Sequence, residues 1–304
     1  MSVQTTGNFA KLLWPGIKKI YGDKYGQHKT EITEIFGKET SNKAYEEYQG
    51  LSGFGLAQKK PEGQPIAIDS MKQGFTTRAT NVTYALGFII TRELYEDDQY
   101  DKVSSQRSRA LAFSMRQTKE IVAANIINRA FTAGYTFGDG SVLCTTSHAN
   151  TAGGTFSNTL AVASDLNQAA LEQMAVDIAN FTDDRGLKIA VMPKKLLVPP
   201  SLMFEAERIL KSALEYDTAN NSVNAIKSRN IFPEGIAVNH YLTDTDAFFI
   251  LTDSEGLVYQ ERRGDEFEPT LENDWDTENA RYKASARYAF TCFDPRAVMG
   301  SPGV

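Results

Sequence analysis

The pattern of apolar and polar positions is most regular between residues 82 and 133. Apolar residues alternate with small or polar ones from Val82 to Thr91, and this period of two predicts a strand. No proline or glycine occurs between Asp97 and Ala133, which predicts one helix roughly 50 Å long that ends at Gly134. Helical spacing relates Ala110, Phe113, Gln117, Ile121, Ala124, Ile127 and Phe131, and Leu111, Met115, Val122 and Ile126 widen this stripe.

Residues 51–92 precede the helix as a long extended segment with turn residues near its centre. The segment 59–63 (KKPEG) forms a polar tip, because proline presets φ and glycine permits a positive φ. We therefore predict an extended hairpin with its tip at 59–63. An isolated two-stranded hairpin is marginal in water, and no neighbouring segment has an apolar pattern that would cover this one. The hairpin is expected to lie on another copy of the chain, which indicates an assembly protein.

The other segments predict an α+β fold with an N-terminal arm and an inserted lobe. Residues 1–50 lack sustained apolar periodicity and are interpreted as an arm that docks on the body or on neighbours. Ser164 is predicted to cap a helix that ends at Phe181. Further predicted elements are a strand, turn and strand over 187–200, a helix over 202–214, strands over 236–242 and 246–252, and a closing strand over 281–293.

This pattern divides the chain into five segments. They are an arm (1–50), a hairpin (51–95), a body with the long helix (96–163), an inserted lobe (164–253) and closing strands (254–304).

Charge is unevenly distributed over a chain with a formal net charge of −6. Residues 1–95 are mildly basic, whereas residues 253–304 carry 11 acidic and 6 basic side chains. Opposite charges of this kind either register one copy against the next or belong to ordinary solvated surface. An acidic chain lacks the concentrated basic footprint of tight duplex binding, and only weak, non-specific contact with nucleic acid stays open.

Few residues suggest a cofactor or a membrane. Two cysteines and three histidines are too few for a disulfide framework and too scattered for a structural zinc site, so no cofactor or metal is predicted. No apolar run approaches the ~20 residues of a membrane span, and the N-terminus lacks the pattern of a secretory signal. The chain is expected to fold in a cytoplasm.

Two clusters are candidates for chemistry. Cys144 and His148, with Asp139 nearby, have the residue types of a thiolate nucleophile and its base, and a cysteine hydrolase is the alternative function. They lie in a Gly/Ser/Thr-rich segment without an oxyanion-hole element, so His148 is expected instead to fix the loop through a side-chain hydrogen bond. Eight carboxylates between 261 and 278 lack the spacing of a calcium loop, so a charged interface is favoured over a metal site.

Four segments in a fixed order carry a resemblance to a known family. They are GFGLAQKKPEGQPIAID at 53–69, LGFIITRELYEDD at 86–98, TTSHANTAGGTFSNTL at 145–160 and DDRGLKIAVMPKKLLVPPSLMFEAERILKS at 183–212. These segments resemble the Mu-type major head subunit of tailed bacteriophages. The resemblance implies the tailed-phage capsid fold named for the phage Hong Kong 97, with an N-terminal arm, an extended hairpin loop, a peripheral domain on a long spine helix, and an axial domain.

The function implied by the resemblance is that of a non-enzymatic major capsid protein of the virion. Many copies, as pentamers and hexamers, are expected to form an icosahedral shell around double-stranded DNA, assembled in the bacterial host cytoplasm. A portal is implied, and a decoration protein stays open. A separate scaffold protein is expected because the hairpin begins by residue 51. An encapsulin-like shell protein is a second alternative.

The charge pattern adds a hypothesis about contacts between copies. The hairpin contributes one apolar and four basic candidates: Phe54, Lys59, Lys60, Lys72 and Arg78. The acidic end contributes Glu266, Glu268, Asp274 and Asp276 as their partners in another copy. Exposed ion pairs contribute little stability, so these contacts are expected to set register rather than strength.

Overall fold

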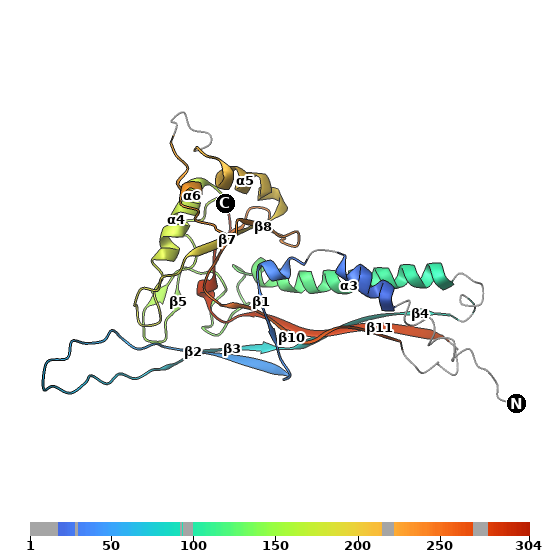
Figure 1. Cartoon of the computed structure of the whole chain (residues 1–304), viewed down its shortest axis with the longest axis horizontal. Coiled ribbons are helices and arrows are strands. Elements are labelled where there is room, and N and C mark those ends of the chain that lie inside the picture. Colours follow the sequence, from blue (N-terminus) through green and yellow to red (C-terminus); the bar gives the residue numbers. More distant parts are fainter. Residues whose placement is uncertain (1–17, 28–29, 92, 94–99, 215–221, 270–278) are drawn as a thin grey trace.

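The computed structural model describes residues 18–27, 30–91, 93, 100–214, 222–269 and 279–304. Within these residues the chain forms an elongated body, a lobe above one end of the body, and a loop that projects beyond that same end (Figure 1). None of the helices in these ranges is both long and apolar enough to cross a membrane.

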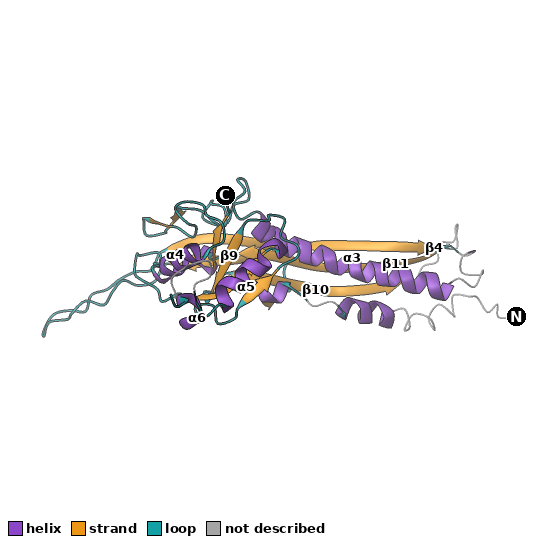
Figure 2. Ribbon diagram, turned by 90° about the horizontal axis from the view of Figure 1, so that it is seen from above, coloured by secondary structure: helices purple, strands orange, loops and turns teal. Residues whose placement is uncertain are grey.

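The body is a four-stranded sheet with one long helix on it. Across the sheet the strands are β1 (Gly37–Thr40), β10 (Leu257–Pro269), β11 (Ala280–Cys292) and β4 (Val82–Ile90). β1 runs parallel to β10, and the other neighbours are antiparallel. Helix α3 (Tyr100–Asn128) lies along this sheet (Figure 2), and the 3-10 turn η1 (Ile32–Glu34) contacts it.

The lobe is built on a second, smaller sheet. Its strands, in order, are β12 (Val298–Ser301), β9 (Phe248–Thr252), β7 (Pro193–Val198) and β8 (Ile236–Val238). Its helices are α4 (Gln168–Ala179), α5 (Met203–Lys211) and α6 (Ala225–Ser228), with the 3-10 turns η2 (Pro200–Leu202) before α5 and η3 (Pro295–Ala297) before β12.

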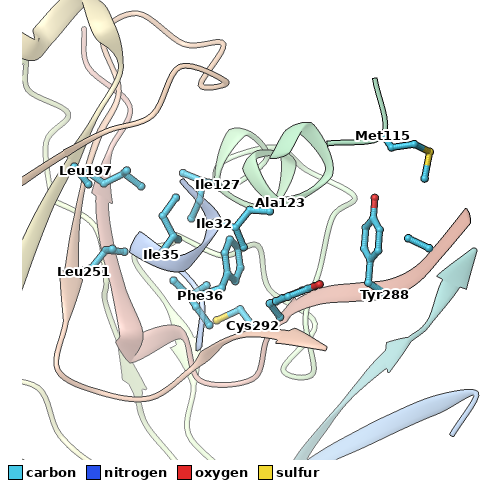
Figure 3. Close-up of a cluster of buried hydrophobic side chains, with 14 of the residues drawn as sticks. Ile32, Ile35, Phe36, Met115, Ala123, Ile127, Leu197, Leu251, Tyr288 and Cys292 are labelled. Atoms are coloured by element: carbon cyan, nitrogen blue, oxygen red, sulfur yellow. The ribbon is translucent and has the colours of Figure 1, made fainter. Parts of the chain in front are cut away.

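Both faces of the lobe's sheet are buried. Leu196 and Val198 face a cluster that includes residues of α4 and α5, whereas Leu197 between them faces a cluster shared with the body. In that shared cluster, Leu197 and Leu251 of the lobe lie near Ile127 of α3 (Figure 3). Because successive side chains of a strand point to opposite faces, one short strand joins two cores and fixes the lobe to the body.

Two short antiparallel pairs complete the fold. β2 (Tyr45–Leu51) pairs with β3 (Gln73–Thr80), with a register break between Gln49 and Leu51, and residues 52–72 form the projecting loop between them. β5 (His148–Ala149) pairs with β6 (Thr155–Phe156) beside the lobe.

The long helix is confirmed, but its buried face differs in part from the predicted stripe. α3 ends at Asn128, so the described helix is about 43 Å long. Between Ala110 and Ile121 the central line of the predicted stripe is exposed, whereas Leu111 and Met115, which were predicted to widen it, are buried together with small residues beside them. The exposed positions are Ala110, Phe113, Gln117 and Ile121, and the buried ones are Ser108, Leu111, Ala112 and Met115. Small residues let the helix approach the sheet closely, and helical spacing alone does not distinguish two neighbouring apolar faces.

The extended segment at 82–91 is a strand, but it is not one side of the hairpin. β4 pairs with β11 in the body, and the hairpin is formed by β2 and β3. β2 begins at Tyr45, within the segment interpreted as the arm. An alternating pattern predicts a strand without specifying its partner, so the pairing was not visible in the sequence.

Several boundaries in the lobe also differ from the prediction. Asn167 caps α4, because its Oδ1 accepts a hydrogen bond from the N–H of Ala170 at 2.8 Å, whereas the Ser164 hydroxyl accepts one from the Asn167 side chain. The segment 187–200 contains one strand, β7, rather than two. Within 254–304, β10 and β11 belong to the body as expected, but β12 returns to the lobe and pairs with β9.

Candidate functional site

The loop at 52–72 is the most exposed part of the described chain (Figure 1). Every residue from Gly53 to Lys72 is exposed, and only Ser52 at the root is buried. Leu56, Ile66 and Ile68 are large apolar residues on this loop, with exposed fractions of 79%, 74% and 97%. Single exposed apolar side chains are ordinary, but several on one projecting segment mark a surface that another molecule covers.

The basic candidates lie on this loop and at its base. Lys59 and Lys60 are exposed at the tip, and Lys72 is exposed at the root. Arg78 on β3 already has a partner in its own chain, because its Nη2 lies 2.6 Å from Oε1 of Glu47 on β2. Phe54, the apolar candidate, is exposed on the outgoing limb of the loop, which runs from Gly53 to the tip; the returning limb runs from the tip to Lys72.

Two of the acidic candidates, Glu266 and Glu268, lie on β10, far from the loop in the same subunit. Glu266 forms an ion pair with Arg263 at 3.3 Å, and Glu268 forms one with Lys283 at 3.6 Å. Asp274 and Asp276 lie outside the described residues. The loop projects from one end of the body and β10 extends toward the other (Figure 1), so one subunit does not bring Glu266 and Glu268 to the loop.

Cys144 and His148 do not form a nucleophile and its base. Burial raises the pKa of the Cys144 thiol well above its ordinary value, which disfavours the thiolate. The two ring nitrogens of His148 are taken by other groups: Nδ1 lies 2.6 Å from Oδ2 of Asp139, and Nε2 lies 3.1 Å from Oδ1 of Asn158. The expectation that His148 fixes this loop through a side-chain hydrogen bond is confirmed.

The carboxylate of Asp139 holds the other end of this contact. Burial alone raises its pKa, but hydrogen bonds from His148 and from the N–H of Ser141 outweigh burial and lower the pKa below its ordinary value. The ring of His148 also stacks on Phe156 at 4.9 Å between centroids. The group therefore fixes the conformation of the 139–156 loop.

Asn158 was not singled out from the sequence, although it lies in the Ser-Asn step of a recognised segment. Its Oδ1 accepts a hydrogen bond from the N–H of Thr145 at 2.9 Å. Its Nδ2 lies 2.7 Å from the carbonyl oxygen of Leu143 and 3.1 Å from those of Pro295 and Val298. One buried amide thus joins the loop to the last strand of the lobe, which a local pattern does not reveal.

Arg296 is a second residue that sequence reasoning missed. Its guanidinium is buried and donates to the carbonyl oxygen of Thr182 at 2.8 Å, to Oδ1 of Asn150 at 3.0 Å and to Oδ1 of Asp184 at 3.2 Å. It also lies over the Phe156 ring, 4.1 Å from the centroid. A cavity of about 280 Å³ is lined by Arg296, Asp139 and the loop root, but not by Cys144.

Within the described ranges, no group of three or more His, Cys, Asp or Glu side chains is placed to hold a metal ion. The part of the carboxylate cluster at 270–278 lies outside those ranges. What the described residues offer is therefore an exposed apolar loop with a basic tip, on a body tied together by buried polar groups.

Comparisons with known proteins agree with this architecture. A family model described as phage capsid protein matches residues 74–299. Among the curated proteins, no match was found.

Three solved structures share the fold. The capsid of an empty GTA particle has a TM-score of 0.55 and 12% identity, and the match covers 91% of each chain. A chain from Mycobacterium phage Adephagia gives 0.53 and 12%, covering 90% of each chain. A virus-like particle from Pyrococcus furiosus gives 0.51 and 12%, covering 94% of this chain and 97% of that one. At these identities the structures show the fold alone, but the family model spans most of the sequence. The chain belongs to the phage capsid protein family and has the Hong Kong 97-like capsid fold.

Proposed function

We propose that the chain is the major capsid protein that self-assembles into the icosahedral head shell enclosing a phage genome. The single observation that carries this proposal is the loop at 52–72. It is exposed along its whole length, carries large apolar side chains and projects away from the body that supports it. Such a loop gains free energy only when another surface covers it. Membership of the phage capsid protein family supports another copy of the chain as that surface.

Five segments have proposed roles in the shell. Residues 1–50 act as an arm, 51–95 as the extended loop, 96–163 and 254–304 as the peripheral domain, and 164–253 as the axial domain whose copies meet around the axes of pentamers and hexamers. The return of β12 to the lobe's sheet adds a part of 254–304 to the axial domain. Obligate interfaces bury ~2,000 Å² or more. Because each copy contacts several others in a shell, many modest contacts together stabilise it.

The charged candidates are proposed to meet between copies. Lys59, Lys60, Lys72 and Arg78 of one copy would face Glu266, Glu268, Asp274 and Asp276 of another. The separation of the loop from β10 within one subunit supports a second copy as the partner. Arg78, Glu266 and Glu268 have partners in their own chain, so the lysines at the tip are the stronger candidates.

The role is structural, without catalysis or a cofactor. The alternative of a cysteine hydrolase has no support, since Cys144 is buried and His148 is bonded to Asp139 and Asn158. A portal, a separate scaffold protein, a possible decoration protein and weak, non-specific contact with packaged DNA complete the proposed partners. The protein would belong to the virion and be assembled in the bacterial host cytoplasm.

An encapsulin-like shell protein remains the second candidate. The likeness to a virus-like particle from Pyrococcus furiosus supports the shared fold of such shells. Shells from infected cells that contain a genome would support the capsid, and shells that contain only a protein cargo would support the alternative.

Negative-stain electron microscopy of the purified protein tests the proposal. We expect closed shells, sheets or tubes, and uniformly single subunits of 33.6 kDa would contradict it. Replacing residues 54–71 with a short Gly-Ser linker keeps β2 and β3 and is expected to give a folded subunit that forms no shells. Normal shells from this variant would exclude the loop as the main contact.

A further inference from the structure

The projecting loop is attached to the lobe a few residues beyond its root. At the root, the N–H of Ser52 donates to the carbonyl oxygen of Lys72 at 3.0 Å, and the N–H of Lys72 donates to the Ser52 hydroxyl at 2.8 Å. From Gly53 to Lys72 the backbone forms no strand. The direction of the loop therefore depends on whichever side-chain contacts hold its two limbs.

One carboxylate holds both limbs. Oδ2 of Asp69, on the returning limb, accepts a hydrogen bond from the N–H of Gly55 on the outgoing limb at 2.8 Å. The same oxygen lies 2.5 Å from Nη1 of Arg185, which lies between α4 and β7 of the lobe. The other Arg185 nitrogen, Nη2, donates to the carbonyl oxygen of Ser70. Hydrogen bonds from the Gly55 N–H, from the Ser70 N–H and from the Arg185 guanidinium lower the pKa of Asp69, with the Gly55 N–H having the largest effect, so the carboxylate stays ionised at neutral pH.

Contacts within the lobe fix the turn that carries Arg185. Oδ1 of Asp183 accepts the N–H groups of Arg185 and Leu187, both at 2.8 Å, and closes a tight turn. Gly186 in this turn has φ +79°, a conformation that glycine adopts without strain. Asp184, the residue before Arg185, forms an ion pair with the buried Arg296. Arg185 thus presents its guanidinium from a well-supported turn.

We propose that Asp69 and Arg185 are positioning residues, forming a latch that sets the direction of the loop before it meets another copy. The inference rests on the proposed function and deepens it, because it concerns how the same loop is presented. An unattached loop must be ordered when it docks, and fixing its backbone costs conformational entropy at every residue. A latch that restricts the limbs in the free subunit reduces this cost at the moment of assembly.

The latch also has a geometric consequence. Gly55 lies so near the carboxylate that a Cβ at this position would lie 3.3 Å from Oδ2 of Asp69 and 3.4 Å from Nη1 of Arg185. A larger side chain at residue 55 would crowd the latch. The absence of a side chain at residue 55 thus suits the Asp69–Arg185 contact.

The first experiment measures the direction of the loop in the unassembled subunit. Spin labels are attached at Lys60→Cys on the tip and Ala190→Cys on the lobe, both exposed, while the native Cys144 and Cys292 are buried and stay unlabelled. We expect Asp69→Arg to broaden the distribution of distances between the labels. An unchanged distribution would overturn the latch.

The second experiment measures assembly with a charge exchange. Asp69→Arg and Arg185→Asp alone are each expected to raise the concentration needed for assembly by roughly fivefold, the effect of losing one exposed charged contact, and the double variant is expected to restore it partly. Glu62→Gln, which removes a carboxylate from the same loop outside the latch, is the matched control and is expected to assemble like the wild type. Broadened distances with unchanged assembly would overturn the positioning role.

The two readouts separate this inference from the proposed function. If the wild-type chain forms no assemblies under any condition, the proposed function fails, and the distance distribution still decides whether the latch exists.

Discussion

Replacing the buried Arg296 with methionine is expected to destabilise the subunit by about 3 kcal/mol. The change removes the donor to the Thr182 carbonyl, to Asn150 and to Asp184, at 2.8 to 3.2 Å. Hydrogen bonds to charged groups contribute about 1.5–3 kcal/mol each, but Asp184 is partly exposed and regains water in the variant. Methionine keeps an apolar contact over the neighbouring aromatic ring, so the estimate lies at the lower end of the range for breaking a buried pair.

The measurement is the free energy of unfolding of the unassembled subunit in urea. Arg296→Lys keeps the charge but not the planar set of donors, and it is expected to cost about 2 kcal/mol. Arg109→Met is the control, because Arg109 is exposed on α3 and the two residues have similar helix propensity, so its effect should stay within about 0.5 kcal/mol. If the free energy of unfolding of Arg296→Met also stays within about 0.5 kcal/mol of the wild type, the buried contacts of Arg296 do not stabilise the subunit as expected.

Three further outcomes are expected. The folded-state pKa of Asp139 lies below its unfolded value, so its contribution to stability is present above pH ~4 and is lost as the pH falls through the folded pKa. Asp139→Asn should therefore flatten the acidic part of the pH profile of the free energy of unfolding, measured in urea. An unchanged profile would contradict this. Burial raises the pKa of both Cys144 and Cys292, so mass spectrometry should find iodoacetamide on them only after unfolding, and rapid labelling of the folded chain would contradict their burial. Gly74→Ala would place a Cβ 2.8 Å from the carbonyl oxygen of Gly50, so β2 and β3 must separate. The amide hydrogens of β2 and β3 should exchange faster than in the wild type, while those of β10 and β11 should not. Unchanged exchange in β2 and β3 would refute the close approach.

The elements with long, regular patterns were predictable from the sequence. α3 and β11 are present where helical spacing and alternation placed them, because a long periodic segment specifies its own secondary structure. The turn at the tip was also predicted correctly, since Gly63 adopts the positive φ of +77° that glycine permits.

The partners of these elements were not predictable in the same way. β4 pairs with β11, and Arg185 meets Asp69 across more than a hundred residues of sequence. Such contacts depend on the fold of the whole chain, and the local sequence around a strand or a single aspartate does not specify its partner. The buried Arg296 was missed for the same reason, because a single arginine in a sequence resembles any solvated one.

One part of the predicted apolar stripe on α3, from Ala110 to Ile121, is left exposed by the subunit and bears on assembly. A helix that is apolar on more than one face usually has more than one covering surface, and over this part of α3 the sheet covers only one face. Ile121, 42% exposed, should therefore matter little to the subunit and more to the shell. We expect Ile121→Ser to leave the free energy of unfolding within about 0.5 kcal/mol of the wild type while raising the concentration needed for assembly. Ile127→Ala, at a fully buried position on the same helix, should instead cost about 2–5 kcal/mol of stability. Assembly of Ile121→Ser at the wild-type concentration would mean that this face stays in solvent in the shell, and that the apolar stripe has no role beyond the single subunit.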